Sequence, residues 1–321
     1  MGDSTEEICL RLRLLLEDAV KRNLAEGILL SGGLDTSVLA AITSKFVSVR
    51  AFTVAFQGAP APDVRYAALV ADSLRLKHLI YYFGGDELYD AIPEVVSATR
   101  SFDPMEIRNS VAIYIGLRAA REDGISTVMT GDGCDELFAG YSFLFKLDGG
   151  QLDLELRRLW SVMSFSSVQL ARALGVNVRL PYLDLDFKSF AMKLDPLYKV
   201  RRERGRTWGK WIIRKAFEGL LPEEVLWRVK TPIECGSGTA MLPSLFERKI
   251  SDAEFEEKRR RYLEEDGVTI RDKEQLSYYE VYRSVVGAPH PDDPMGRLCP
   301  QCNSNVEEKA TYCRTCGAYP V

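Results

Sequence analysis

Residues 31–37 have the types and spacing needed to bind a phosphate group. They read Ser-Gly-Gly-Leu-Asp-Thr-Ser and follow an apolar run at residues 27–30 that is typical of a buried strand. The two glycines allow a tight turn that brings backbone amides close to an anion, and the helix that follows points its positive end toward it. An ordinary strand-to-helix turn is the alternative interpretation. The loop lacks the lysine of a Walker sequence, so it does not belong to that class.

The side chains of this loop indicate the ligand. Three hydroxyl groups can donate hydrogen bonds to phosphate oxygens, and they belong to Ser31, Thr36 and Ser37. Asp35 is a carboxylate beside a predicted phosphate site, and that arrangement is favourable only when a cation such as Mg²⁺ lies between the two negative groups. The loop therefore predicts a nucleotide with magnesium, held by the backbone of Gly32 and Gly33 and by Asp35 through the metal.

Four of the seven cysteines form two pairs near the C-terminus. Cys299 and Cys302 make one Cys-x-x-Cys pair, Cys313 and Cys316 make the other, and ten residues separate the pairs. This spacing is typical of a zinc ribbon, in which four thiolates bind one tetrahedral Zn²⁺. Disulfides are disfavoured because the number of cysteines is odd and the N-terminus lacks a secretory signal. A closed four-thiolate site is structural, so we expect the ribbon to present a surface, and a protein or tRNA partner is favoured over an internal brace.

Composition sets the broad class of the protein. The chain has 321 residues, of which 46% are hydrophobic and 27% charged, and its net charge is −4. These values are ordinary for a globular protein and give no overall case for nucleic-acid binding. No apolar run approaches the roughly 20 residues needed to cross a bilayer, so we expect no membrane partner. Because no export signal is visible, the predicted location is the cytoplasm.

Alternating strand and helix patterns predict an α/β fold. Strand patterns at residues 27–30, 47–56, 79–83 and 127–129 alternate with helix patterns at residues 6–25, 35–46, 63–76 and 109–123. Such alternation predicts a parallel sheet with right-handed crossovers. From about residue 150 helix patterns dominate, which predicts a helical C-terminal half. Prolines between residues 287 and 296 indicate a linker. We therefore predict a domain over residues 1–287, a linker over 288–297 and a zinc ribbon over 298–321.

The phosphate loop and several later segments resemble one enzyme family. Residues 31–37 look like the PP-loop of the N-type ATP pyrophosphatases. Residues 129–141, Met-Thr-Gly-Asp-Gly-Cys-Asp-Glu-Leu-Phe-Ala-Gly-Tyr, are similar to the second block of asparagine synthetase and β-lactam synthetase. Residues 179–184 and 210–238 resemble further blocks in the same order. The resemblance covers about residues 8–287 and implies the parallel-sheet fold of the adenine nucleotide alpha hydrolases (HUP/PP-loop).

This resemblance implies an ATP-dependent amidoligase. A carboxylate attacks the α-phosphorus of ATP, pyrophosphate leaves, and ammonia or an amine then attacks the acyl-adenylate and releases AMP. The resemblance assigns Mg²⁺ to Asp35 and Asp135, and stabilisation of the adenylate-forming transition state to Lys230. Arg108 is expected to neutralise phosphate charge. Outside the first loop, the residues expected to contact ATP are Leu30, Val54, Thr130 and Gly131.

Two positions depart from the family pattern and leave the substrate open. Asp132 lies where asparagine synthetases have a glutamate, at the position that polarises or deprotonates the attacking amine. Asn177 lies where the family often has a glutamate. Gly2 follows Met1, where glutamine-dependent synthetases carry their nucleophilic cysteine, so we expect no glutamine hydrolysis on this chain. The nitrogen would then come from free ammonia, from a separate glutaminase subunit, or from an amine on the substrate.

The alternative hypothesis is a tRNA-modifying enzyme that adenylates a nucleobase for thiolation or amidation. PP-loops joined to zinc ribbons resemble tRNA 2-thiolation enzymes in layout, and thiols of Cys134 and Cys235 near the pocket could carry a persulfide. Cys134 is also explained as a small residue within the second block. Two basic stretches, residues 199–206 and 258–261, could bind a partner. Phosphate attraction to the pocket explains the first without RNA, and a solvated helix face explains the second.

Overall fold

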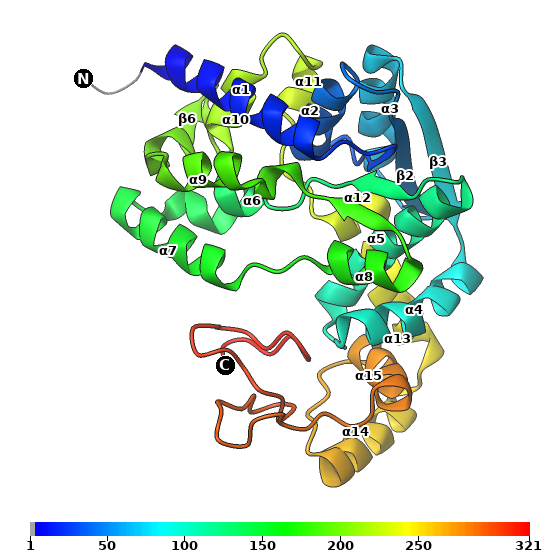
Figure 1. Ribbon diagram of the computed structural model, residues 1–321. Helices are drawn as coiled ribbons and strands as arrows, with labels where there is room; N and C mark the ends of the chain where they lie inside the picture. Colours follow the sequence, from blue (N-terminus) through cyan, green and yellow to red (C-terminus); the bar gives the residue numbers. More distant parts are fainter. Residues whose placement is uncertain (1–3) are drawn as a thin grey trace.

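A five-stranded parallel sheet forms the centre of the computed structural model, which describes residues 4–321 (Figure 1). Its strands are β1 (Gly27–Leu29), β2 (Arg50–Phe56), β3 (Lys77–Phe83), β4 (Thr127–Met129) and β5 (Asn177–Arg179). They lie in the order β3-β2-β1-β4-β5, and every neighbouring pair is parallel. The predicted α/β class is therefore confirmed. Met1 and Gly2, which carry the expectation about glutamine hydrolysis, lie outside the described residues.

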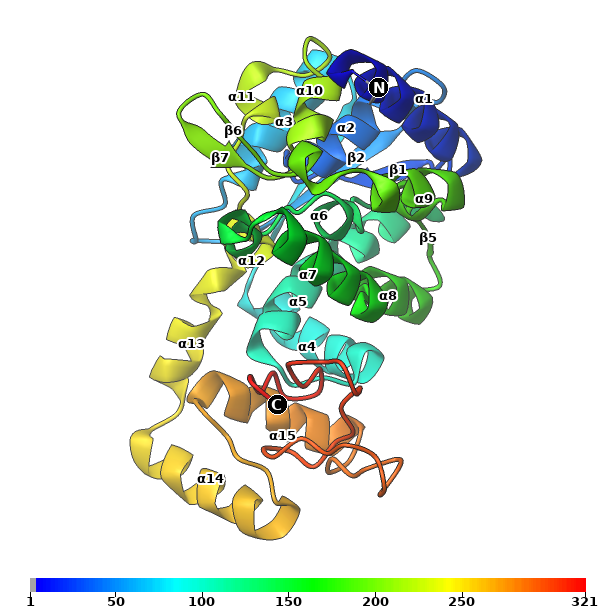
Figure 2. The ribbon, with the colours of Figure 1, turned by 90° about the vertical axis from the view of Figure 1, so that its left-hand side faces the viewer.

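Helices surround this sheet and dominate the chain after β4 (Figures 1 and 2). The first five are α1 (Thr5–Arg22), α2 (Leu34–Thr43), α3 (Asp63–Leu74), α4 (Gly85–Thr99) and α5 (Pro104–Glu122). The next five are α6 (Cys134–Leu137), α7 (Gly149–Val162), α8 (Ser166–Leu174), α9 (Leu185–Lys193) and α10 (Trp211–Ala216). The last five are α11 (Glu223–Leu226), α12 (Ile233–Ser237), α13 (Leu242–Lys249), α14 (Asp252–Asp266) and α15 (Lys273–Val285). Among residues 4–321, no helix has both the length and the apolar character that a bilayer crossing requires.

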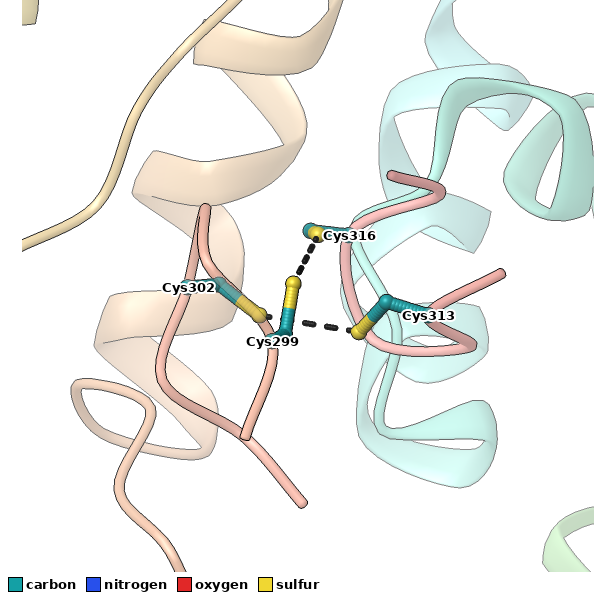
Figure 3. Close-up of side chains that lie close together, drawn as sticks. All are labelled: Cys299, Cys302, Cys313 and Cys316. Carbon is teal, nitrogen blue, oxygen red and sulfur yellow. Dashed lines mark hydrogen bonds between the residues drawn. The ribbon is translucent and has the colours of Figure 1, made fainter. Parts of the chain in front are cut away.

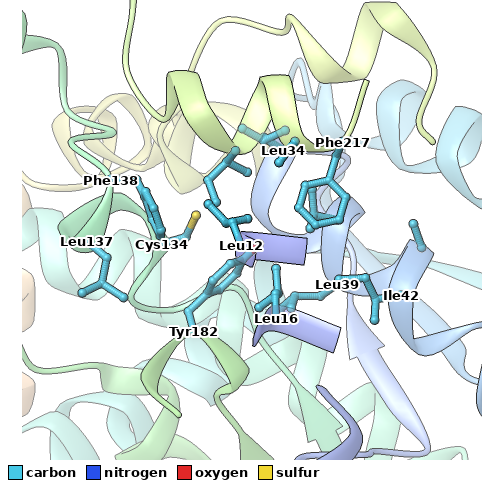
Figure 4. Close-up of a cluster of buried hydrophobic side chains, with 14 of the residues drawn as sticks. Leu12, Leu16, Leu34, Leu39, Ile42, Cys134, Leu137, Phe138, Tyr182 and Phe217 are labelled. Atoms are coloured by element: carbon cyan, nitrogen blue, oxygen red, sulfur yellow. The ribbon is translucent and has the colours of Figure 1, made fainter. Parts of the chain in front are cut away.

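Alternate residues of the strands face two separate apolar layers. In β2, Ala51 packs into a cluster with residues of α1, α2, α3, α9 and α10. The next residue, Phe52, packs into a second cluster with residues of α4, α5, α8 and α15. Figure 4 shows part of the first cluster, in which Leu12 and Leu16 of α1 lie near Leu39 of α2. Burial of both faces explains why the central strands are mostly apolar instead of alternating strictly with polar residues.

Two strand segments lack a strand pattern in the sequence. β5 is three residues long at the sheet edge, and two of its three side chains are exposed. The antiparallel hairpin of β6 (Arg201–Glu203) and β7 (Arg206–Trp208) is rich in arginine. Both are held by backbone hydrogen bonds, which do not depend on apolar side chains. Hydrophobic periodicity therefore gave no signal for either.

The segment after α15 folds back against α4 and α15 (Figure 2). The backbone amide of Phe102, between α4 and α5, donates to the carbonyl of Thr315 at 2.7 Å. The adjacent Ser101 hydroxyl donates to the carbonyl of Arg314, also at 2.7 Å. The amide of Thr269, between α14 and α15, donates to the carbonyl of Gln301 at 2.8 Å. Both cysteine pairs are thus bonded to loops of the body.

Gln275 of α15 is the central buried contact between the body and the cysteine-rich segment. Its Nε2 donates to the carbonyl of Cys316 at 2.8 Å, and its Oε1 accepts the backbone amide of Arg271 at 2.8 Å. The guanidinium of Arg271 donates to the carbonyls of Cys316 and Gly317 at 2.9 and 3.0 Å. The segment is therefore braced within the chain, and the expected protein or tRNA partner stays a prediction. The division at residues 287 and 298 stays a prediction.

Replacement of Gln275 with leucine should destabilise the protein. The change leaves the carbonyl of Cys316 and the amide of Arg271 without this fully buried partner. We expect the free energy of unfolding to fall by about 2 kcal/mol, measured by urea denaturation. The control is Gln169→Leu on α8, which makes the same chemical change at an exposed position and should shift stability by no more than about 0.5 kcal/mol. Equal effects of the two variants would contradict the proposed bracing role.

Candidate active site

The loops that follow β1 and β4 meet at the carboxyl end of the sheet. β1 and β4 are adjacent, with Ile28 paired to Met129, although they are distant in sequence. The chain winds from β1 to β3 on one side of the sheet and continues at β4 on the other. Ligands of open α/β sheets bind outside such a reversal of strand order. The contact is close, because a Cβ on Gly131 would lie 3.0 Å from the Cβ of Asp35.

The first loop has the geometry of a phosphate cradle. Gly32 has a φ of 64°, and a Cβ there would lie 2.3 Å from the backbone nitrogen of Ala67 on α3, so only glycine fits. The hydroxyl of Ser31 accepts the amide of Gly33 at 3.2 Å and lies 3.3 Å from the hydroxyl of Thr36. The Ser37 hydroxyl is buried and has no partner among residues 4–321. A phosphate oxygen would satisfy it, so the loop fits the expected ligand.

The strand residues expected to contact ATP are partly used within the sheet. The amide of Leu30 donates to the carbonyl of Phe52 at 2.8 Å, and the carbonyl of Leu30 accepts the hydroxyl of Thr53. Val54 is half-buried in β2, the neighbour of β1. The amide of Leu30 is therefore not free for a nucleotide. Only the second lone pair of its carbonyl and its side chain remain available.

One lysine joins the acidic residues of the two loops. The Nζ of Lys210 lies 2.6 Å from an oxygen of Asp35 and 2.6 Å from an oxygen of Asp135. The Nζ of Lys230 lies 2.6 Å from the other oxygen of Asp135. The two aspartates are thus close enough to share one cation, and the Mg²⁺ assigned to them stays a prediction. Lys210 itself was quoted as part of a family block without a role, and its bridging position is visible only in three dimensions.

The electrostatics of this cluster favour the charged forms of Asp135 and Lys210. Burial by itself would raise the pKa of Asp135, but the charges and hydrogen bonds of Lys210 and Lys230 outweigh it and hold that pKa below its ordinary value. Burial by itself would lower the pKa of Lys210, but the carboxylates of Asp135 and Asp35 outweigh it and raise that pKa. The buried charges are therefore paired, which is the condition for their stability in a poorly solvated site.

Two glycines allow these charged groups to approach. A Cβ on Gly140 would lie 1.8 Å from Oδ1 of Asp135 and 2.4 Å from Cε of Lys210. A Cβ on Gly209 would lie 2.1 Å from the carbonyl of Ala139. Lys210 has a φ of 53°, an uncommon conformation for a residue with a side chain, and its amide donates to the carbonyl of Phe138 at 2.8 Å. Local backbone contacts therefore fix the position of the bridging lysine.

Two buried arginines support both sides of the site. Arg228 donates to the carbonyl of Ser31 at 3.1 Å and to Asp63 at 2.6 Å, and it lies over the ring of Tyr66 at 4.0 Å. Arg214 donates to the carbonyl of Gly209 at 3.1 Å and to the carbonyl of Arg228 at 3.2 Å. They connect the first loop to the segment that carries both lysines. In the sequence, these two arginines were recognised only as members of a family block, without a role.

Asp132 is held by two hydroxyl groups beside the cluster. Its Oδ2 accepts the hydroxyl of Thr130 at 2.8 Å and the hydroxyl of Ser167 at the start of α8. Burial raises the pKa of Asp132 above its ordinary value, the two hydroxyl donors oppose the rise, and the charges of Asp135 and Asp35 add to it. A carboxylate with a raised pKa is a better proton acceptor than an exposed one.

Other predicted residues lie in different surroundings. The Nε of Arg108 lies 3.6 Å from the buried Glu274 of α15 and donates to the carbonyl of Pro104 at 3.2 Å. It is thus paired with a carboxylate of the other layer, and among residues 4–321 its guanidinium forms no hydrogen bond or ion pair with either loop. Asn177 is exposed at the sheet edge. Cys134 is fully buried, lies next to Asp35 and Lys210 as well as in the first apolar cluster, and has a pKa that burial raises, whereas Cys235 is exposed.

The four C-terminal cysteines converge on one point (Figure 3). Their Sγ atoms all lie within 4.8 Å of one another, and all four residues are buried. Cys299 and Cys316 are 3.6 Å apart, and Cys302 and Cys313 are 3.7 Å apart, measured between Sγ atoms. Each close pair joins cysteines from different Cys-x-x-Cys segments, as expected when two knuckles contribute two thiolates each. This donor set fits a tetrahedral zinc ion.

Comparisons with known proteins agree on one family. The family model described as Asparagine synthase matches residues 11–160 and 154–276. A probable glutamine-hydrolysing asparagine synthetase of Dictyostelium discoideum is 32% identical over 89% of this chain and 58% of its own length. Asparagine synthetase B of Escherichia coli (strain K12), also glutamine-hydrolysing, is 32% identical over 87% of this chain and 54% of its own length.

The matches differ in how much of each protein they cover. The chain spans about half the length of these relatives. Among solved structures, NMN synthetase from Francisella tularensis aligns over 88% of this chain and 94% of its own, with a TM-score of 0.41 and 14% identity. The family model covers most of the chain. The chain therefore belongs to the asparagine synthase family.

Proposed function

We propose that this protein adenylates a carboxylate with ATP, releases pyrophosphate, and transfers the acyl group to ammonia or an amine with release of AMP. The observation that supports this best is the convergence of Asp35 and Asp135 on one ammonium group at the carboxyl end of the sheet. Two carboxylates from adjacent strand ends suit a nucleotide–metal complex at that point. The family membership supports an ATP-dependent ligase and leaves the substrate open.

The residues present fit one magnesium ion together with a phosphate chain. Asp35 and Asp135 supply hard oxygen ligands, and the unpaired hydroxyl of Ser37 supplies a donor for phosphate. Mg²⁺, when bound, would neutralise charge on the pyrophosphate leaving group. Lys210 and Lys230 are fixed cations beside the same carboxylates. In the proposed reaction they stabilise the negative charge that develops on phosphate oxygens as the carboxylate attacks the α-phosphorus.

The second step requires a neutral amine. Asp132 lies next to the cluster with a raised pKa and two hydroxyl donors that fix its orientation. We assign it to accept a proton from the amine as that amine attacks the adenylate. Three nitrogen sources fit the proposal: free ammonia, a separate glutaminase subunit, and an amine on the substrate.

The structure lends no support to thiol chemistry at this site. A persulfide carrier must be reachable by the substrate, but Cys134 is fully buried among apolar side chains and its thiol has a raised pKa. Cys235 is exposed, but its pKa is also raised, chiefly by burial of its sulfur. Thiolates rather than thiols are the reactive form. These surroundings favour amide formation over tRNA thiolation.

We also propose that the four C-terminal cysteines bind one zinc ion with a structural role. All four positions of a tetrahedral site are taken by thiolates, so no position remains open for a substrate. The zinc would fix the two knuckles whose carbonyls accept bonds from the body. Its role in this protein is then to hold the C-terminal segment against α15 and the loop before α5.

The first prediction from this function concerns the products and Lys230. Incubation with ATP, Mg²⁺ and a screen of candidate carboxylates, with and without ammonium, should yield AMP and pyrophosphate. Because Lys230 is placed to stabilise the transition state, Lys230→Ala should slow pyrophosphate release by roughly 10²- to 10³-fold. The control Lys249→Ala on α13 removes an exposed lysine elsewhere and should retain the rate. ADP as the product would overturn the proposal.

The second prediction separates the two chemical steps. Asp132→Asn keeps an acceptor for Thr130 and Ser167 but removes the proton acceptor, so pyrophosphate release should persist while amide formation falls by about 10²-fold or more. In the wild type, amide formation should be lost as the pH falls through the pKa of Asp132, above the ordinary value of 3.8. Parallel loss of both steps in the variant would contradict this assignment.

The third prediction concerns the metal. Elemental analysis of the purified protein should find one zinc per chain, and Cys302→Ser should retain less, since one of four ligands is lost. Hydrogen exchange at residues 101–103 should increase in the variant, because the carbonyls that accept bonds from Ser101 and Phe102 are no longer fixed. A wild-type protein that takes up no zinc when zinc is supplied would refute the site.

A further inference from the structure

The hairpin of β6 and β7 carries a group of unusually free arginines. Arg201, Arg202 and Arg206 are all exposed, and within residues 4–321 none has an ion pair to a carboxylate. The fourth arginine, Arg204, differs because it is paired with Glu223 and lies 4.0 Å from Glu218. Since the whole chain carries a net charge of −4, three unpaired cations on one short hairpin are not a consequence of composition.

Tryptophans hold two of these guanidinium groups in place. Arg201 lies over the ring of Trp211 at 4.4 Å, and Arg206 lies over the ring of Trp208 at 5.0 Å. Stacking fixes the plane of an arginine while its N–H groups stay available at the edge. Arg202 lies on the opposite face of the hairpin, since its register partner is Thr207. Both faces of the hairpin therefore present cationic donors to solvent.

The carboxylate on the hairpin is already engaged. Glu203 accepts the indole N–H of Trp211 at 2.5 Å and lies 3.6 Å from Nζ of Lys215. In the hairpin register it stands opposite Arg206, but no ion pair joins the two. The positive charge of the hairpin is therefore not cancelled locally, and an anion from outside the chain would find little competition.

An exposed aromatic ring lies on the neighbouring 3-10 turn η1 (Ser142–Lys146). Phe143 is 53% exposed and stacks on Tyr141, with ring centroids 5.7 Å apart and an interplanar angle of 13°. The Nζ of Lys230 lies 6.0 Å from the same Tyr141 ring. An exposed, flat and supported ring beside a cationic site is the arrangement on which a nucleobase stacks.

The turn and the hairpin lie next to each other and next to the residues of the candidate active site. A Cβ on Gly209, the residue after β7, would lie 2.6 Å from the ring of Phe145 in η1, and the next residue is Lys210. In Figure 2 the hairpin lies along the same side of the molecule as α12, which follows Lys230. We call this surface the arginine rim and define it by Arg201, Arg202, Arg206, Phe143 and Lys146.

We propose that the arginine rim binds single-stranded nucleic acid and presents it to the adenylating site. Free guanidinium groups bind phosphates of the backbone, and Phe143 stacks with one base. One consequence rests on the proposed function: the bound strand then carries the carboxylate or the amine of the reaction. The binding itself follows from the surface alone.

The test is fluorescence anisotropy with labelled RNA and DNA strands of about 16 nucleotides, added to the full zinc-loaded chain at about 50–200 mM salt. Arg202→Ala/Arg206→Ala should weaken binding at least about tenfold and reduce the slope of log K against log salt by about 1.4. Phe143→Ala should weaken binding about fivefold with the slope unchanged. The matched control Arg259→Ala/Arg260→Ala removes two exposed arginines from α14 and should change neither.

Several outcomes separate this inference from simpler ones. Tighter binding of one strand supports the rim and identifies the preferred nucleic acid, and equal binding of RNA and DNA supports the rim without a preference between them. Heparin bound as tightly as RNA, with no effect of Phe143→Ala, would overturn it, since the rim would then attract any polyanion. Failure of the wild type to bind at low salt would also overturn it. Pyrophosphate release with a small carboxylate, measured on the same samples, tests the proposed function independently.

Discussion

The contact of Lys210 with Asp35 and Asp135 is the constraint on which the site depends. Two buried carboxylates from adjacent loops repel each other unless a cation lies between them. In this structure the cation is an ammonium group 2.6 Å from each. The ammonium group thus stabilises the two buried carboxylates and places fixed charges at the candidate active site.

Much of the surrounding structure serves this contact. Gly140 and Gly209 leave room that a side chain would fill, and the left-handed backbone of Lys210 directs its side chain inward. Arg228 connects the first loop to the segment between the two lysines, and Arg214 connects that segment to the backbone before Lys210. The sheet contributes by placing β1 beside β4, so that two distant loops meet where the strand order reverses.

The protein extends from this site in two directions. On one side, the hairpin that leads into Lys210 carries three arginines of the arginine rim, so the proposed strand-binding surface and the cluster around Lys210 share one piece of backbone. On the other, the cysteine cluster packs into the layer of α4, α5 and α15, where Arg108 is paired with Glu274. The cysteine-rich segment therefore behaves as part of the body, in contrast to a freely presented module. The cysteine cluster contacts the layer on one face of the sheet. The opposite face is covered by the first apolar cluster, which includes residues of α1, α2 and α3.

The sequence by itself determined the parallel sheet, the first loop, the pair of aspartates and the four-cysteine cluster. These features depend on local patterns, because glycines, hydroxyl groups and paired cysteines at short, fixed spacings define the local geometry. The tertiary structure alone decided the bridging role of Lys210, which is 175 residues from Asp35 in the chain, and the support by Arg228, 197 residues from Ser31. It also paired Arg108 with α15 and turned the ribbon inward. Such contacts depend on how whole layers pack, and no local pattern of residue types encodes that.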